Sequence, residues 1–198
     1  MPPPLRDLRL IDALETLPAT PFNGRVWRVV RAGRDPCICS AAGNRWDDGT
    51  FDVLYTATVR EGSIAEMYFH LKRGQPVFPS KLRYTLHELQ VSIDGLLDLS
   101  DIKDLAKLGL DIARFGQLSY QDRKGEYPNS QEIAEVANFI GSPEPGDAAG
   151  MLVPNARWDC SNLVVFCGHA GPGAIEEIEN HGVIDWREWE RAQSTSPA

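Results

Sequence analysis

The stretch that decides the fold of this chain runs from Gly43 to Glu66 and reads GNRWDDGTFDVLYTATVREGSIAE. Its Gly- and Asp-rich start is typical of a loop, its VLYTA segment of a strand, and its last part of a helix. The stretch carries a guanidinium, two aromatic rings and a carboxylate, on Arg45, Trp46, Tyr55 and Glu66. Little else in the chain indicates chemistry, so these groups are the first candidates for a site.

The four side chains have the chemistry of a dinucleotide site. A planar guanidinium donates hydrogen bonds in pairs, which suits a diphosphate. An aromatic face suits the flat, cationic nicotinamide ring. A carboxylate stabilises a sugar carbon that becomes positive as its leaving group departs. The stretch therefore predicts a site that binds a dinucleotide.

Length and composition predict one globular domain. The chain has 198 residues, of which 42% are hydrophobic and 24% charged, and its formal net charge is −8. A chain of this size can bury a stable hydrophobic core without disulfides or a structural metal. The acidic balance argues against direct nucleic-acid binding, which depends on neutralising phosphates with Lys and Arg. No secretory segment opens the chain and no apolar run reaches the roughly 20 residues of a membrane span. We therefore expect a cytoplasmic protein without a membrane partner.

The four cysteines are predicted to be reduced thiols, as is usual in the cytoplasm. Cys37 and Cys39 are spaced as one half of a metal site, whose other ligands would come from Cys160, Cys167 or His169. This spacing matches no recognised zinc pattern. We therefore expect no metal.

Hydrophobic periodicity and turn residues predict an α+β fold. Strands are expected at residues 25–31, 51–58, 82–93, 151–153 and 162–166. Helices are expected at residues 5–17, 63–73, 100–108, 130–140 and 175–180, with irregular chain at 109–128. The predicted organisation is an N-terminal arm at 1–24, one domain at 25–191 and a disordered tail at 192–198. A doubly wound sheet is disfavoured because strands and helices do not alternate regularly.

Each candidate residue has a structural alternative. Glu66 completes the capping-box pattern Ser63-x-x-Glu66, in which the glutamate bonds back to the amide of the helix cap. Tyr55 lies in the middle of a strand, where a core aromatic is usual. Arg28 points to the opposite face of its strand from the arginines on either side of it. It either meets an anionic partner or lies in solvent on an edge strand.

Several segments occur in the order and spacing of one known family. They are Trp27-Arg28, the loop at 43–48, the VLYTA strand at 53–57, Ala65-Glu66 and the VPNA segment at 153–156. With these segments, roughly residues 25–170 resemble the RES domain family, whose proteins are the toxins of bacterial toxin–antitoxin pairs. The loop departs from the family's GGRWNP-type pattern at Asn44, Asp47 and Asp48, and Asn155 stands where a serine is frequent.

The resemblance implies an ADP-ribosyltransferase-like fold, with a split, mainly antiparallel sheet, flanking helices and NAD in a cleft. It implies that NAD is a substrate whose nicotinamide–ribose bond is broken, and that ADP-ribose passes to a protein side chain, phosphate or water. It also implies an Xre-like antitoxin as a protein partner. Where a protein side chain is the acceptor, a cellular protein is a second partner.

The resemblance also implies roles for individual residues. Arg28 and Arg45 would hold the diphosphate or the adjoining ribose, and Tyr55 would stack on nicotinamide. Glu66 would orient a ribose hydroxyl and stabilise the emerging ribose cation. The catalytic candidates are thus Glu66, Arg28 and Tyr55. The NAD-binding candidates are Arg28, Arg45, Tyr55, Ser130, Gln131 and Asn155, with Ser161 as an alternative for the family's serine.

A rival hypothesis is a non-catalytic module that binds a nucleotide or a protein. In that module Glu66 only caps its helix, and the arginines only bind an anion.

Overall fold

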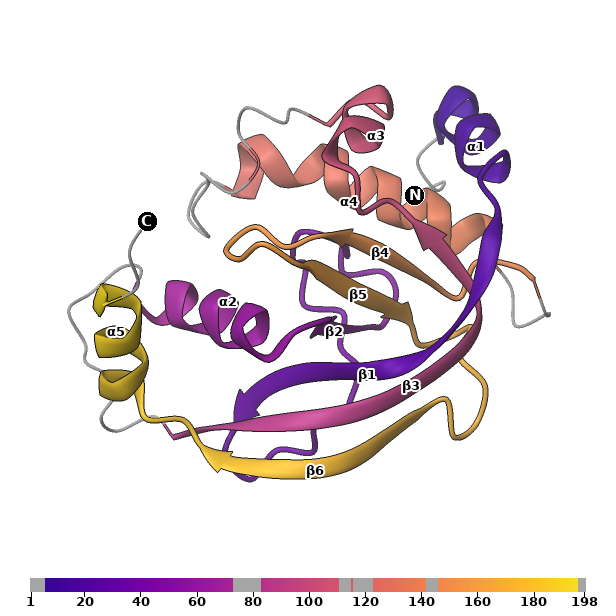
Figure 1. Cartoon of the computed structure of the whole chain (residues 1–198). Coiled ribbons are helices and arrows are strands. Elements are labelled where there is room, and N and C mark those ends of the chain that lie inside the picture. The colour runs from indigo at the N-terminus through magenta and orange to yellow at the C-terminus, as the bar shows by residue number, and fades with distance from the viewer. Residues whose placement is uncertain (1–5, 73–82, 111–114, 116–122, 142–145, 196–198) are drawn as a thin grey trace.

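The molecule is built on a split sheet with helices around it. The computed structural model describes residues 6–72, 83–110, 115, 123–141 and 146–195. The strands are β1 (Ala19–Arg31), β2 (Val53–Ala57), β3 (Tyr84–Asp98), β4 (Gly150–Pro154), β5 (Ser161–Phe166) and β6 (Ile175–Val183). The helices are α1 (Leu8–Glu15), α2 (Arg60–Lys72), α3 (Ile102–Lys107), α4 (Arg123–Ile140) and α5 (Trp186–Thr195). Helices α1, α3 and α4 lie above β4 and β5, α2 and α5 lie at one end, and β6 lies at the outer edge (Figure 1).

The long strand β3 organises the sheet. Strand β1 pairs with it in antiparallel register along nearly its whole length. The start of β3 also pairs with β6, antiparallel, and its end pairs with β4, parallel. From β4 the sheet continues through β5 to β2 with antiparallel pairings. Strand β2 meets β1 only at Trp27 and Ala57, so the two strands diverge beyond that point. The predicted α+β class, with a split, mainly antiparallel sheet and flanking helices, is confirmed.

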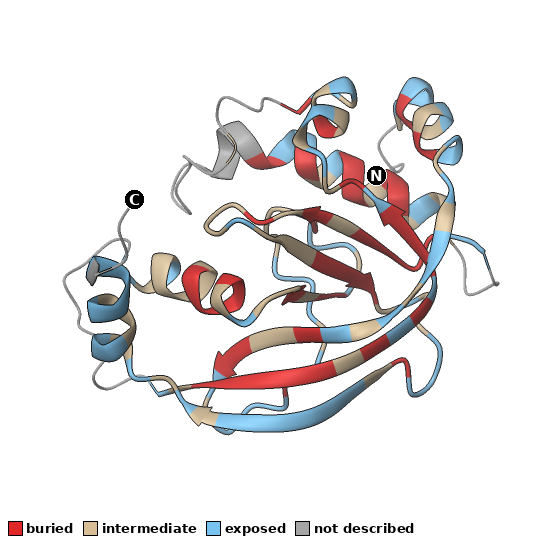
Figure 2. Cartoon of the chain, viewed as in Figure 1, coloured by how far each residue is buried: buried red, intermediate tan, exposed pale blue. Residues whose placement is uncertain are grey.

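The hydrophobic core lies on both faces of the β4–β5–β2 part of the sheet. Successive strand side chains point to opposite faces. Val164 and Phe166 therefore pack in the cluster that holds Ile133 of α4, whereas Leu163 and Val165 pack with the residues of β1 and β3. Figure 2 shows the inner side of α4 and most of β4 and β5 buried, and β6 largely exposed.

Helix α1 is part of the same core. Asp7 caps α1 by accepting a hydrogen bond from the amide of Arg9 at 2.9 Å. Leu10 and Leu14, four residues apart and therefore on one helix face, are buried in the cluster of α4. Strand β1 then begins at Ala19, inside the predicted arm.

The structure corrects several predicted elements. Residues 175–180, predicted as a short helix, form part of β6, which pairs with β3. Helix α4 starts at Arg123, within the segment 109–128 predicted to be irregular. Sequence reasoning missed α5, which carries the chain from the predicted domain into the predicted tail and continues to Thr195.

Parts of some predictions lie outside the described residues. These are residues 1–5 of the predicted arm, the end of the helix predicted at 63–73, the start of the strand predicted at 82–93, residues 111–114 and 116–122 of the segment predicted to be irregular, and residues 196–198 of the tail. Within the described part of the chain, no helix combines the length and apolar character needed to cross a membrane.

Candidate functional site

A cavity of about 280 Å³ lies where β1 and β2 diverge. Its walls come from these two strands, α2, the loop that carries residues 40–46, and the loop after β4. Arg28, Arg45, Tyr55 and Glu66, which the sequence analysis singled out, all line it. Ser130, Gln131 and Asn155 are not among the residues that line it. The fold thus brings a guanidinium pair, an aromatic ring and a carboxylate to one opening.

Glu66 reaches the cavity from the middle of α2. Its Oε1 accepts a hydrogen bond from the backbone amide of Ala156 at 3.2 Å, and only 25% of its side chain is exposed. Burial raises the pKa of the Glu66 carboxyl, against the opposing effects of the Arg157 and Arg45 charges. The capping-box alternative is wrong, because α2 begins at Arg60 and Ser63 lies inside it.

Arg28 is held by backbone carbonyls. Its Nη1 donates to the carbonyl oxygens of Pro36 at 2.6 Å and Ile38 at 2.9 Å. Burial lowers the pKa of Arg28 to about 10, partly offset by nearby Cys37 and Asp35. Arg28 does not lie free in solvent, as the edge-strand alternative expected, because its side chain is partly buried and bonds these two carbonyls, although β2 pairs with β1 only at Trp27. A half-buried guanidinium in a cavity suits an anionic group.

The loop that presents Arg45 is built around a buried carboxylate. Asp47 accepts the backbone amides of Gly43 and Asn44 and the hydroxyl of Tyr55. Gly43 has a φ of +70°, a conformation that side chains rarely adopt. The guanidinium of Arg45 lies 4.8 Å from the ring centre of Phe115. The loop therefore holds the Arg45 charge at the cavity wall.

Tyr55 both lines the cavity and holds the loop that carries Arg45. Its ring lines the cavity, while its hydroxyl accepts from the amide of Trp46 at 2.8 Å and donates to Asp47 at 3.0 Å. Burial, and the nearby Asp47 charge, raise the pKa of Tyr55 well above its ordinary value. Trp46 also lines the cavity, but it is 1% exposed and belongs to the core cluster. Of the two aromatics, Tyr55 is the better candidate for ring stacking.

The other predicted NAD-binding residues support the walls of the cavity from behind. The hydroxyl of Ser130 donates to the carbonyl of Tyr127 within α4 at 3.1 Å. The amide of Gln131 donates to the carbonyl oxygens of Asn44 at 2.7 Å and Asp47 at 3.0 Å, which ties the Arg45 loop to α4. Ser161 lies at the start of β5, where its carbonyl accepts from Thr58.

Asn155 orders the loop after β4. Its Oδ1 accepts the amides of Arg157 at 2.7 Å and Trp158 at 3.0 Å. Its Nδ2 donates to Oδ1 of Asn162 at 2.7 Å. These contacts resemble an Asx turn, in which a side chain holds the backbone two residues further on.

Sequence reasoning missed several residues that line the cavity: His70, Tyr127, Arg157 and Asn162. His70 follows Glu66 by four residues, which places both on one face of α2, and its Nε2 lies 3.9 Å from Oε2 of Glu66. That spacing was a usable signal. Arg157 offered no periodic signal, because it lies in a loop directly after the VPNA segment.

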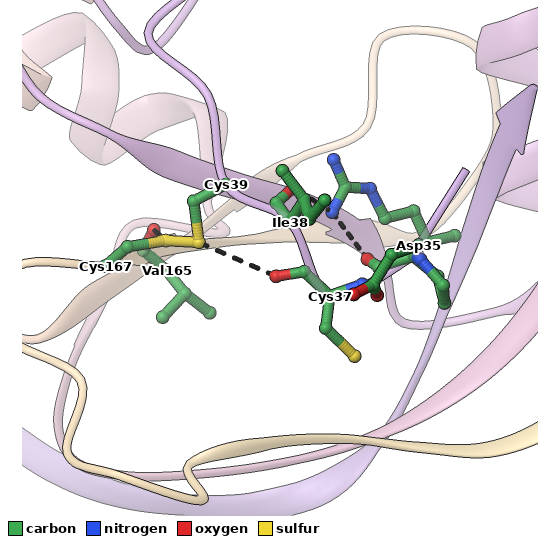
Figure 3. Close-up of a disulfide and its surroundings, with 8 residues drawn as sticks. Asp35, Cys37, Ile38, Cys39, Val165 and Cys167 are labelled. Atoms are coloured by element: carbon green, nitrogen blue, oxygen red, sulfur yellow. Dashed lines mark hydrogen bonds between the residues drawn. A yellow bond between two sulfur atoms is a disulfide. The ribbon is translucent and has the colours of Figure 1, made fainter.

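The structure corrects the prediction that all four cysteines are thiols. Cys39 and Cys167 form a disulfide (Figure 3). Cys37 and Cys160 are free. The bridge joins the loop after β1, whose Pro36 and Ile38 carbonyls hold Arg28, to the end of β5. The proposed Cys-x-Cys half of a metal site is therefore not formed, because Cys39 is already bonded.

A different group of potential metal ligands lies on β3 and β6. Glu88, Glu179 and His181 bring their ligand atoms within 4.8 Å of one another. Glu88 is also paired with Arg25 at 3.0 Å. None of these residues lines the cavity.

Comparisons with known proteins relate this chain to one family and one solved fold. The family model described as RES domain matches residues 25–187. Among curated proteins, none matches the chain. A chain of the crystal structure of the M. tuberculosis MbcT–MbcA toxin–antitoxin complex superposes with a TM-score of 0.72. The two chains are 18% identical, and the match covers 96% of this chain and 99% of that one. At this identity the likeness concerns the fold.

Proposed function

This chain belongs to the RES domain family, and from that premise we propose that it is the toxin of a bacterial toxin–antitoxin pair and acts on NAD. One observation carries the proposal: the fold gathers Arg28, Arg45, Tyr55 and Glu66 around a single cavity. The family supplies the substrate class, and the cavity supplies the groups that such a substrate needs.

Cleavage of the nicotinamide–ribose bond is the reaction that this cavity supports best. The pair of electrons in the bond leaves with nicotinamide, whose ring becomes neutral, and positive charge develops on the ribose. Glu66 stabilises that charge, as carboxylates do in glycoside cleavage. Arg28 and Arg45 hold the diphosphate, and the Tyr55 ring stacks on nicotinamide. The ADP-ribose then passes to an acceptor: a protein side chain, phosphate or water.

An antitoxin is the proposed partner, because an enzyme that consumes NAD harms the cell that makes it. The fold match to a chain of the MbcT–MbcA toxin–antitoxin complex supports this partner. The family resemblance specifies an Xre-like protein, and a cytoplasmic location follows from NAD as the substrate. A cellular protein is a second partner if a side chain accepts ADP-ribose.

The proposal is tested by incubating the purified chain with NAD and measuring free nicotinamide. The wild type should release nicotinamide, and Glu66→Gln should lower the rate by a hundredfold or more, on the order of a lost transition-state interaction. Glu61→Gln is the matched control, since Glu61 lies on the same helix but does not line the cavity. Full turnover by Glu66→Gln would refute the carboxylate role.

The rival, a non-catalytic nucleotide-binding module, makes a different prediction in the same assay. It binds NAD, as isothermal titration detects, but releases no nicotinamide. The acceptor is then identified by mass spectrometry of reactions with and without phosphate, and with cellular protein present. Phosphorylated ADP-ribose, free ADP-ribose and modified protein correspond to the three acceptors.

A further inference from the structure

We propose that Arg157 is a positioning residue that acts through Glu66, by setting a fixed positive charge and an ordered loop against its carboxylate. The inference rests on the proposed function, in which Glu66 is the catalytic carboxylate. Nothing in the VPNA segment before Arg157 predicts this role. It arises from the way in which the loop after β4 meets α2.

The backbone of Ala156, the residue before Arg157, is hydrogen-bonded to Glu66. The amide of Ala156 donates to Oε1 of Glu66 at 3.2 Å. Asn155 fixes this backbone, because its side chain accepts the amides of Arg157 and Trp158. The loop therefore meets the carboxylate in one defined geometry.

The side chain of Arg157 is fixed from a second direction. Its guanidinium carbon lies 3.1 Å from the ring centre of Phe69, which is three residues after Glu66 on α2. Stacking on an aromatic face suits the planar guanidinium better than an ammonium. The same side chain lines the cavity with Glu66. Arg157 is therefore held against α2 at the level of the carboxylate.

Helix α5 holds the loop from its other side. The rings of Trp158 and Trp189 lie with their centres 5.7 Å apart. Glu190, the next residue on α5, accepts hydrogen bonds from Tyr68 and Lys72 of α2. The loop and α2 are thus joined through a common neighbour.

Arg157 acts on Glu66 through its positive charge, which stabilises the ionised carboxylate. Burial raises the pKa of the Glu66 carboxyl, and the Arg157 charge is the largest of the effects that lower it. Arg45 lowers it less, and among the described residues His70 lies four positions further on the same helix while Cys160 is near enough for the Glu66 charge to raise its pKa. Loss of the Arg157 charge therefore leaves a larger fraction of Glu66 protonated at a given pH.

The experiment is the pH dependence of nicotinamide release by Arg157→Gln and Arg157→Lys. In Arg157→Gln the acidic limb should move to higher pH, so that the rate falls about tenfold on that limb for each pH unit of displacement. The loss on the alkaline plateau should be smaller. Arg157→Lys keeps the charge and should return the limb toward the wild-type position. Arg60→Gln, on the exposed start of α2, is the matched control and should leave the profile unchanged.

A folded Arg157→Gln with the wild-type pH profile would overturn the inference. So would a loss of rate in Arg157→Gln that is equal at every pH and is not relieved in Arg157→Lys. If the wild type releases no nicotinamide, the proposed function fails, and a second measurement still tests the pairing. Thermal unfolding of the wild type, Arg157→Gln, Glu66→Gln and the double variant gives the coupling between the two side chains. Additive changes in stability, with no coupling, would also overturn it.

Discussion

The hydroxyl of Tyr55 donates to the buried carboxylate of Asp47 at 3.0 Å, and this contact joins β2 to the loop that carries Arg45. The ring of the same tyrosine lines the cavity. The contact therefore links the Tyr55 ring to the loop that positions the Arg45 guanidinium, and Asp47 is the common acceptor that holds this loop together.

Asp47→Ala is expected to destabilise the protein by about 3 kcal/mol, because two backbone amides and the Tyr55 hydroxyl lose their common acceptor. Urea unfolding measures the change. Asp48→Ala is the matched control: Asp48 is exposed and accepts from the amide and hydroxyl of the exposed Thr50, so its loss should cost much less. Equal effects of the two variants would show that the loop does not depend on Asp47.

Arg28→Lys is expected to reduce kcat/KM for NAD by tenfold or more. The Arg28 guanidinium uses one nitrogen for both the Pro36 and Ile38 carbonyls, and its planar fork leaves further donors for an anion. A lysine ammonium cannot reproduce that geometry. Steady-state kinetics of nicotinamide release measure the change, with Arg25→Lys as control, because Arg25 contacts Glu88 and does not line the cavity. Unchanged kinetics in Arg28→Lys would contradict the assigned role.

Glu66→Gln is expected to stabilise the folded protein at neutral pH while it lowers turnover. Burial raises the pKa of Glu66 in the folded state, so the folded state binds more protons than the unfolded state between the ordinary and the raised value. Wild-type stability therefore falls as the pH rises through that window, and a neutral glutamine avoids this loss. In thermal unfolding the variant should have the higher midpoint temperature at about pH 7.5, and the difference in midpoint should shrink toward about pH 4. A difference that grows toward acidic pH would contradict the assigned direction.

Reduction of the Cys39–Cys167 disulfide is expected to destabilise the protein by about 4–5 kcal/mol, because the bridge closes a loop with a sequence separation of 128 residues. Turnover should fall as well, since the bridged loop supplies the carbonyls that hold Arg28. Cys39→Ser should reproduce both effects. Cys37→Ser should not, because Cys37 is a free thiol. Alkylation and intact-mass measurement check the bridge directly, and four reactive thiols in the unreduced protein would rule it out.

Local sequence patterns correctly predicted the strands that carry site residues, but they failed in segments whose pattern does not distinguish a helix from a strand or fix where a helix begins. The VLYTA segment and the residues around Arg28 were correctly placed on strands, because β-branched and aromatic side chains favour extended backbone. The helix predicted at residues 175–180 was wrong, because these residues form part of the largely exposed strand β6. Only pairing with β3 decides between helix and strand there. The start of α2 was also misplaced, because Ser63 has the character of a cap although it lies inside the helix.

The sequence alone determined the family and the four residues that meet at the cavity, because both reside in short motifs whose residues are neighbours along the chain. It also determined the α+β class, which follows from the irregular order of strands and helices. The tertiary structure decided which groups surround them: the amide of Ala156 and the charge of Arg157 at Glu66, the carbonyls at Arg28, and the pairing of Cys39 with Cys167. These contacts join segments as much as 128 residues apart. No periodicity records such contacts, because they depend on how whole elements pack and on which polar groups need partners once water is excluded.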